Sequence, residues 1–298
     1  MFFVTFVVKE RDGMAITKAV IPVAGLGTRL LPATKSQPKE MLPIGRKPIV
    51  QYVVEELAKA GLENILFVTG RKKRSIEDHF DFAPEMGETG MESDIPGNLS
   101  FFYIRQSSPN GLGDAISYAE KFVGSDSFAV ALGDSVIQGG DHSSLLRRMM
   151  EFHQSEHAGA TVAFMEVGEE DVRKYGIAKP KGRPEAMFEV ETMIEKPQPS
   201  EAPSRLAVAA RYIFDPVIFE ALKRTPSGRK GELEITDAMN TLLKMGHKVI
   251  GIRLRSDEKR YDVGGFETYF KAFLDFALDD PEYGYMIRQY MRSRLHEV

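Results

Sequence analysis

The sequence of 298 residues contains no cysteine. Disulfides, thiolate zinc sites and cysteine nucleophiles are therefore excluded, because each of them needs a thiol. No apolar run approaches the roughly 20 residues that a membrane-spanning helix requires. Charge is close to balanced, with 39 basic and 43 acidic residues and a net charge of −4. That balance argues against a nucleic-acid partner bound through bulk basicity, and no membrane partner is expected.

The chain starts with a short apolar stretch, Met-Phe-Phe-Val-Thr-Phe-Val-Val, which is followed by charged residues at 9–12. No small-residue cleavage site follows it, so we expect no signal peptide and a cytoplasmic location. Residues 1–17 are expected to form an N-terminal extension, of which residues 1–14 are an added strand, a floppy segment or a mis-called start. Residues 18–298 are long enough to bury a large core and are expected to form a single domain.

Apolar runs alternate with helical patterns in the first half of the chain. Strands are expected at 19–24, 64–69, 101–104 and 128–132, and helices at 49–60, 75–80 (with Ser75 as the N-cap) and 113–122. This alternation predicts an α/β fold in which helices cover both faces of a parallel sheet. Ligands bind such sheets beyond the carboxyl ends of the strands. Gly25, Gln106 and Asp134 each follow an expected strand, so they can share one crevice.

The second half of the chain is more mixed. Strands are expected near 161–167, 177–178, 187–195, 207–213 and 249–254, and closing helices at 269–278 and 282–295. Residues 81–98 are rich in glycine, proline and acids and are expected to form a loop. No hexapeptide repeat follows, which excludes an appended β-helix domain.

A glycine loop follows the first expected strand. Gly25 and Gly27 can adopt positive φ and let the backbone approach a ligand, and consecutive N–H groups in such a turn bind phosphate oxygens. Arg29 adds a planar cationic fork, and Lys39 adds a point charge. Together these residues predict a phosphate cradle.

The cradle matches neither of the two common glycine loops. The dinucleotide fingerprint G-x-G-x-x-G requires a third glycine where this chain has Leu30. A P-loop requires Gly-Lys-Ser/Thr, which is absent at the right spacing. Pro32 and Pro38 favour an extended loop over an immediate helix. A nicotinamide-dependent dehydrogenase is therefore not expected.

The loop sits in a longer string, V-A-G-L-G-T-R-L-L-P-A-T-K over residues 23–35, followed by P-K-E-M-L-P over residues 38–43. This string resembles the opening signature of the bacterial UTP–glucose-1-phosphate uridylyltransferases, a branch of the sugar-nucleotide nucleotidyltransferases. The resemblance implies a Rossmann-like three-layer α/β/α fold with a mostly parallel central mixed sheet. It assigns residues 18–140 mainly to nucleotide binding, and residues 141–298 mainly to sugar-phosphate binding and C-terminal helices.

The resemblance also implies an activity, which is transfer of a uridylyl group from UTP to glucose 1-phosphate with release of pyrophosphate. Mg²⁺ is the implied cofactor, and a homodimer or homotetramer is the implied assembly. The implied catalytic residues are Arg29, Lys39, Asp134 and Lys196. The implied nucleotide contacts are Ala24, Gly25, Gly27, Thr28, Glu40, Gln106 and Gly111. The implied sugar-phosphate contacts are Gly176, Glu195 and Lys196, and the implied metal ligands are Asp134 and Asp262.

The residues themselves support part of this assignment. Asp134 and Asp262 each lie between an expected strand and a turn. Two carboxylates can hold Mg²⁺ together with substrate phosphates and water, although an aspartate at a turn is often only a turn former. Glu195 could accept hydrogen bonds from sugar hydroxyls, and Lys196 could neutralise a phosphate. Whether these groups meet stays open from the sequence.

Two further patterns are given structural interpretations. His153 and His157 have helical i, i+4 spacing, but the glutamate between them is not at the zinc-peptidase position, so a solvated helix face is expected. The basic residues 71–74 are expected to form a surface turn. Two alternative functions stay open: a thymidylyltransferase or related sugar-1-phosphate enzyme, since one methyl group discriminates by only about 1–3 kcal/mol, and a non-catalytic nucleotide-sugar sensor.

Overall fold

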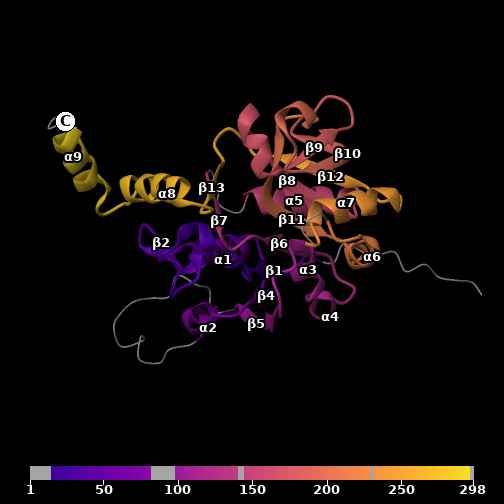
Figure 1. Cartoon of the computed structure of the whole chain (residues 1–298), viewed down its shortest axis with the longest axis horizontal. Coiled ribbons are helices and arrows are strands. Elements are labelled where there is room, and N and C mark those ends of the chain that lie inside the picture. The colour runs from indigo at the N-terminus through magenta and orange to yellow at the C-terminus, as the bar shows by residue number, and fades with distance from the viewer. Residues whose placement is uncertain (1–14, 82–97, 140–143, 229–230, 296–298) are drawn as a thin grey trace, which may run out of the picture.

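The structure, a computed structural model, describes residues 15–81, 98–139, 144–228 and 231–295. Its centre is a nine-stranded sheet (Figure 1). The strand order is β5 (Ser100–Arg105), β4 (Asn64–Thr69), β1 (Lys18–Pro22), β6 (Phe128–Ala131), β11 (Leu206–Phe214), β8 (Ala160–Glu166), β12 (Val249–Arg253), β10 (Met187–Glu195) and β9 (Gly176–Pro180).

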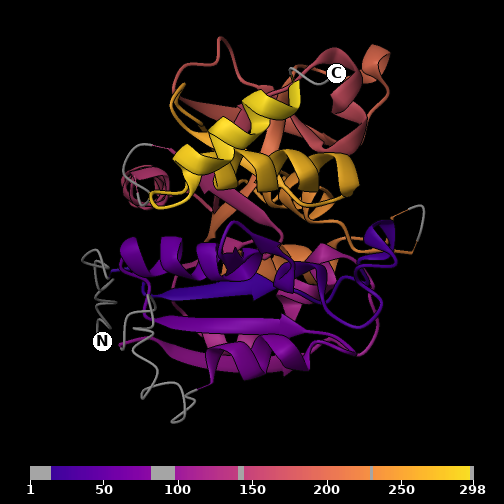
Figure 2. The same ribbon diagram turned by 90° about the vertical axis from the view of Figure 1, so that its left-hand side faces the viewer.

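The sheet is mixed, as predicted, and its two halves differ in strand direction. Strands β5, β4, β1 and β6 are parallel neighbours, and their arrows run side by side in Figure 2. In the second half only β8 and β12 pair in parallel, whereas β11, β10 and β9 pair antiparallel with their neighbours. The predicted parallel character therefore applies mainly to the strands from the first half of the chain.

Helices cover both faces of the sheet, which gives the predicted three layers. One face packs against α3 (Leu112–Ser117), α4 (Glu120–Val123), α6 (Val217–Arg224) and α7 (Ile235–Lys244). The other face packs against α1 (Ile49–Lys59), α2 (Arg74–Phe80) and α5 (Ser144–Ser155). Strand β1 shows the cause: Val20 points into the first layer, and Ala19 and Ile21 point into the second, because successive side chains alternate across a strand.

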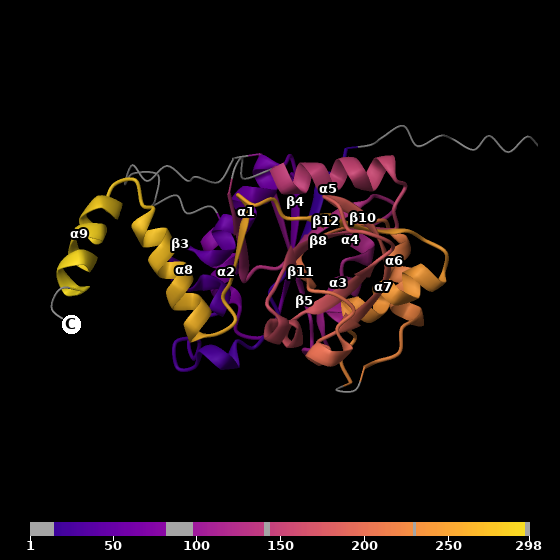
Figure 3. The ribbon, with the colours of Figure 1, turned by 90° about the horizontal axis from the view of Figure 1, so that it is seen from above.

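Two C-terminal helices, α8 (Phe266–Leu278) and α9 (Gly284–Leu295), extend from one end of the molecule (Figure 3). Helix α8 contacts β13 (Lys259–Asp262) and β2 (Pro43–Ile44). Strand β13 pairs with β7 (Ser135–Gln138), and β2 pairs with β3 (Lys47–Pro48). Short 3-10 turns are η1 (Thr28–Leu30), η2 (Lys39–Met41), η4 (Glu169–Lys174) and η5 (Pro199–Glu201). Within the described residues, no helix combines the length and apolar character that crossing a membrane requires.

Most expected elements are present within a few residues, and a few are wrong. The helix expected at 113–122 is two short helices, α3 and α4. Helix α2 begins at Arg74, and the Ser75 hydroxyl is buried without a partner instead of capping the helix. The predictions for residues 1–14 and for most of the 81–98 loop lie outside the described residues, but Ile16 is buried in the core, so the folded part begins before residue 18.

Candidate active site

A cavity of about 460 Å³ opens at the carboxyl ends of β1, β5 and β6. All residues expected to contact the nucleotide line it, together with three of the four expected catalytic residues. They are Ala24, Gly25, Gly27, Thr28, Arg29, Lys39, Glu40, Gln106, Gly111 and Asp134. The strand ends therefore bring these residues together, as the sequence pattern predicts. Another cavity of similar volume, between α1 and the α8–α9 turn, contains none of the expected site residues.

The glycine loop forms one wall of this cavity. Gly27 has φ +66° and leads into the turn η1, so its predicted positive φ is confirmed. Gly25 does not have positive φ, and that part of the prediction is wrong. Thr34 fixes the loop by donating to the Gly27 carbonyl at 2.8 Å. Arg29 is exposed, and it forms no hydrogen bond or ion pair with any residue that the structure describes, so its guanidinium is available to a ligand.

Lys39 and Asp134 lie side by side in the lining of the cavity. Lys39 lies in the turn η2, Asp134 follows β6, and their side chains form an ion pair. Burial would raise the pKa of Asp134, but Lys39 and Arg260 outweigh it and hold that pKa below its ordinary value. Burial would likewise lower the pKa of Lys39, but Asp134 and Glu40 outweigh it and raise that pKa. Both groups are therefore charged near neutral pH.

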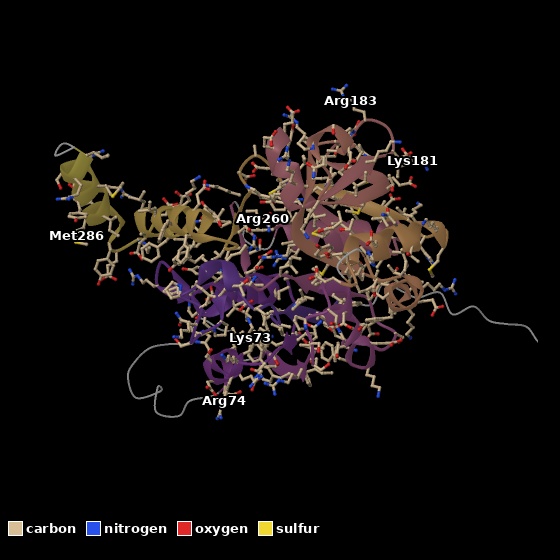
Figure 4. All side chains as sticks on the ribbon, viewed as in Figure 1. Lys73, Arg74, Lys181, Arg183, Arg260 and Met286 are labelled. Atoms are coloured by element: carbon tan, nitrogen blue, oxygen red, sulfur yellow. The ribbon has the colours of Figure 1, made fainter. Side chains whose placement is uncertain are left out.

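Glu40 contacts a lysine that was expected at the surface. Its carboxylate lies 2.7 Å from the Lys73 ammonium, and the two side chains are only 2% and 6% exposed. Figure 4 shows Lys73 inside the first half of the chain and Arg74 at the surface. The prediction of a surface turn is thus wrong for Lys73 and holds for the exposed Arg71 and Lys72, whereas Arg74 is exposed but begins helix α2. The buried pair ties the P-K-E-M-L-P string to the end of β4.

Gln106 and Gly111 lie on the opposite wall. The Gln106 side chain is buried and donates to Asp114 at 2.5 Å. Gly111 has φ +106°, and a Cβ there would lie 2.7 Å from the Leu233 carbonyl oxygen. No side chain fits at that position without displacing backbone, because real Cβ atoms do not approach so closely. The glycines of this loop are therefore required for close packing against the second half of the chain.

The expected sugar-phosphate residues cluster at the ends of β9 and β10. Gly176 pairs with Glu195 across these strands. Glu195 lies 2.6 Å from the Lys196 ammonium and accepts a hydrogen bond from Thr236 at 2.7 Å. Lys196 is half-exposed and has φ +46°. None of these residues lines the nucleotide cavity, so the expected site consists of two neighbouring parts.

Residues 231–236, Gly-Glu-Leu-Glu-Ile-Thr, join the two parts and are not among the residues predicted from the sequence. Leu233 exchanges backbone hydrogen bonds with Asn110 and Gly113 on the nucleotide side, at 2.7 and 2.8 Å. Glu232 lines the cavity, whereas the Glu234 carboxylate lies 3.8 Å from the Lys196 ammonium on the sugar side. The segment therefore links the cavity to the Glu195–Lys196 cluster.

Arg260 is a second residue that the sequence analysis did not select. It donates to the Ser135 hydroxyl at 2.7 Å and to Asp262 at 2.8 Å. Its guanidinium carbon lies 5.2 Å from the centre of the Tyr175 ring, and Figure 4 places it between the two halves of the molecule. Its Nη1 is buried with no partner among the described residues. A signal was present: Arg260 and Asp262 are two residues apart on one strand and so share a face.

Arg211 is wholly buried and lies beneath the Asp134 segment. It forms a two-pronged ion pair with Glu56 of α1, at 3.0 and 2.6 Å. It also donates to the carbonyl oxygens of Ala210 and Ser135, each at 2.9 Å. Because Ser135 follows Asp134, this buried cation fixes the backbone that carries a central site residue.

The donor set, two carboxylates, suits a hard cation such as Mg²⁺ better than a soft metal. Asp134 and Asp262 are close neighbours, because the amide of Val263 donates to the Asp134 carbonyl at 3.0 Å. Burial raises the pKa of Asp262, and the negative charge of Asp134 raises it further. Across the described ranges, no cluster of three or more His, Asp or Glu side chains could hold a metal by itself. Mg²⁺ commonly binds through one or two carboxylates and completes its shell with phosphates and water, so two aspartates are sufficient.

Comparisons with known proteins agree with this geometry. The Nucleotidyl transferase family model matches residues 18–278. A Streptococcus pyogenes UTP–glucose-1-phosphate uridylyltransferase is 42% identical in an alignment of 289 residues that covers 93% of this chain and 93% of that one.

Two solved structures share the fold. A UDP-glucose pyrophosphorylase complexed with UDP-glucose has a TM-score of 0.81 and 42% identity, and covers 88% of this chain and 98% of that one. A UTP-bound UGPase from Acinetobacter baumannii has a TM-score of 0.85 and 34% identity, and covers 93% and 99%. The family model and these relatives match nearly the whole of the chain, including both halves of the fold. Together with the cavity at the strand ends, this match shows that the chain belongs to the nucleotidyl transferase family, among the UTP–glucose-1-phosphate uridylyltransferases.

Proposed function

We propose that this enzyme transfers the uridylyl group of UTP to glucose 1-phosphate, giving UDP-glucose and pyrophosphate. One observation carries the proposal: a strand-end cavity lined by Arg29, Lys39 and Asp134 lies beside a half-exposed lysine, Lys196, which is next to Glu195. Two phosphate-bearing substrates need two binding regions, and the segment 231–236 connects the cavity to the region around Lys196.

The nucleophile needs no general base. A phosphate monoester has a second pKa of about 6, so its oxygen is already anionic near neutral pH. That oxygen attacks the α-phosphorus of UTP in line; the new oxygen–phosphorus bond forms as the bond to the bridging α–β oxygen breaks, and pyrophosphate leaves with that electron pair. Catalysis then consists mainly of positioning two polyanions and neutralising their charge.

Each cation of the site has a distinct part in this reaction. Arg29, which has no partner among the described residues, binds the β- and γ-phosphates that become pyrophosphate. Lys39 holds the α-phosphate, and releases its ion pair with Asp134 as the nucleotide binds. Lys196 binds the phosphate of the sugar, while Glu195 accepts hydrogen bonds from sugar hydroxyls.

Asp134 and Asp262 would hold Mg²⁺, which when bound supplies positive charge to the triphosphate. Arg260 fixes the Asp262 carboxylate by donating to it at 2.8 Å. The charges of Lys39 and Arg260 keep the pKa of Asp134 low, so its carboxylate is ionised and ready for a cation.

Initial rates of pyrophosphate release test the proposed function. The enzyme is incubated with Mg²⁺, with each common nucleoside triphosphate in turn, and with glucose, galactose or mannose 1-phosphate. Release should be fastest with UTP and glucose 1-phosphate. A faster rate with dTTP would favour the thymidylyltransferase alternative, and no release with any pair would favour the nucleotide-sugar sensor.

We also propose that the enzyme forms a homodimer or homotetramer. The extending helices and the turn between them expose several large apolar side chains, which a partner subunit could cover. They are Phe266, Phe270, Phe273, Leu274, Tyr283, Tyr285, Met286, Tyr290 and Leu295. Light scattering coupled to size-exclusion chromatography should give a mass of at least twice 33.4 kDa, and a monomer mass would contradict the proposal. A cytoplasmic location stays a prediction.

A further inference from the structure

The side chain of Gln106 has a fixed orientation at the nucleotide cavity. It lies directly after β5, it is 4% exposed, and it lines the cavity with Gly111 and Leu112. A glutamine amide presents an acceptor on one side and a donor on the other, and it can usually turn over to suit its partner. Whether a ligand meets a hydrogen-bond donor or an acceptor at this point therefore depends on which side of the amide faces the cavity.

Asp114 determines that orientation. The Gln106 amide nitrogen donates to the Asp114 carboxylate at 2.5 Å and, over a longer distance of 3.4 Å, to the Gly111 carbonyl. Both partners are acceptors only, since neither a carboxylate nor a carbonyl has a proton to give. If the amide turned over, its oxygen would face these two acceptors and would lose a charge-assisted hydrogen bond.

The amide oxygen is consequently the group left for a ligand. No residue in the described part of the chain donates a hydrogen bond to this oxygen. Since it is also not one of the fully buried polar atoms without a partner, it is accessible from the cavity. A nucleobase that meets Gln106 must therefore offer an N–H group to it. Uracil and thymine carry an N–H at ring position 3, whereas cytosine has a bare acceptor nitrogen there.

We infer that Asp114 is a specificity-determining residue, which locks Gln106 as an acceptor and so selects imide pyrimidines over cytosine. The inference rests on the proposed function, because it needs the base of the nucleotide to lie against Gln106. Asp114 acts through Gln106 and does not itself touch the base. Because the thymine methyl group is not on this edge, the lock does not separate uracil from thymine.

Asp114→Asn tests the lock at nearly constant size. Asparagine can either accept from the Gln106 amide nitrogen or donate to the Gln106 oxygen, so both orientations become available. Losing one charge-assisted hydrogen bond corresponds to roughly a tenfold or larger change. The ratio of kcat/KM for UTP over CTP, measured at fixed glucose 1-phosphate, should fall at least tenfold, while the ratio for UTP over dTTP should stay unchanged.

Ser107→Ala is the matched control. Ser107 lies in the same loop and contacts Tyr118 instead of the Gln106–Asp114 pair, so this variant should keep both ratios. A D114N variant that loses activity equally with UTP and CTP would show a merely structural role and overturn the inference. An unchanged UTP-to-CTP ratio would overturn it as well.

A probe of the unaltered enzyme covers the case in which D114N does not fold. In 3-methyl-UTP a methyl group replaces the N–H that Gln106 is inferred to read. Its kcat/KM should be at least tenfold below that of UTP, and equal use of the two nucleotides would overturn the inference. If UTP itself supports no transfer, the proposed function fails; if UTP is used and the discrimination is absent, only the role of Asp114 fails.

Discussion

Replacing Arg211 by methionine should destabilise the protein strongly. Arg211 is fully buried, and its partner Glu56 is only 4% exposed. Methionine fills much of the same volume but carries no charge, so the Glu56 carboxylate loses its counter-ion in a dry environment. Breaking a buried ion pair by removing one partner costs about 3–5 kcal/mol. The carbonyls of Ala210 and Ser135 also lose a donor, which places the expected loss in the upper part of that range.

Urea unfolding followed by circular dichroism measures this loss. A loss of 3–5 kcal/mol raises the unfolded population by roughly a hundredfold to several thousandfold. The control is Arg224→Met, which removes an exposed i, i+4 pair with Glu220 and should cost about 0–1 kcal/mol.

The double variant R211M/E56L identifies the cause of the loss. It removes both buried charges, so it should recover most of the stability that R211M loses. A loss in R211M no larger than in R224M would refute the buried-pair argument. A double variant as unstable as R211M would show that the two carbonyl bonds, and not the ion pair, carry the effect.

Three further predictions concern pH and the site. His153 is buried beside Thr161, and burial lowers its pKa in the folded protein to about 4. Because His153 of the unfolded chain is protonated below about pH 6.5, the free energy of unfolding should fall by about 3 kcal/mol as the pH falls from 6.5 to 4. His153→Gln should make the free energy of unfolding, measured by urea titration, depend less on pH in this range, and an unchanged pH dependence would contradict the prediction. Asp134→Asn should lower kcat more than a hundredfold with the circular dichroism spectrum retained, and near-normal rates in saturating Mg²⁺ would reject its role as a metal ligand. Lys196→Ala should lower kcat/KM for glucose 1-phosphate about tenfold with the KM for UTP little changed, since one charged hydrogen bond is lost at a half-exposed site; an unchanged response to glucose 1-phosphate would reject its role.

The sequence predicts well those features that depend on local pattern. The buried strand at β1 is a continuous apolar run, and alternation along it divides Val20 from Ala19 and Ile21 between two layers. The meeting of Gly25, Gln106 and Asp134 follows from parallel strands alone, since their carboxyl ends share one edge of the sheet. Such features need no knowledge of distant partners.

Features that depend on distant partners could not be predicted. Lys73 was expected in a surface turn, and no buried partner was expected for Arg211, yet both are buried, because Glu40 and Glu56 meet them in the folded chain. The prediction of a solvated helix face is wrong for His153, which lies on the buried face of α5 against Thr161, and His157 lies beyond the end of that helix. Nothing in the sequence signals these pairings, because the same charged residue type occurs both at the surface and in buried ion pairs.

The break between α3 and α4 has a similar explanation. No glycine or proline marks residues 118–119, so the helical pattern runs on through them.

Arg260 was not predicted as a site residue, because its partners Ser135 and Tyr175 come from other elements of the fold.

The position of bond cleavage in UTP tests the central claim most directly. The enzyme is incubated with glucose 1-phosphate and with UTP labelled by ³²P at the α-phosphorus, and in parallel with UTP labelled at the γ-phosphorus. The proposed transfer predicts that all of the α label in consumed UTP appears in UDP-glucose and all of the γ label in pyrophosphate, in equal amounts. Release of α label as UMP, or of γ label as inorganic phosphate, would contradict it.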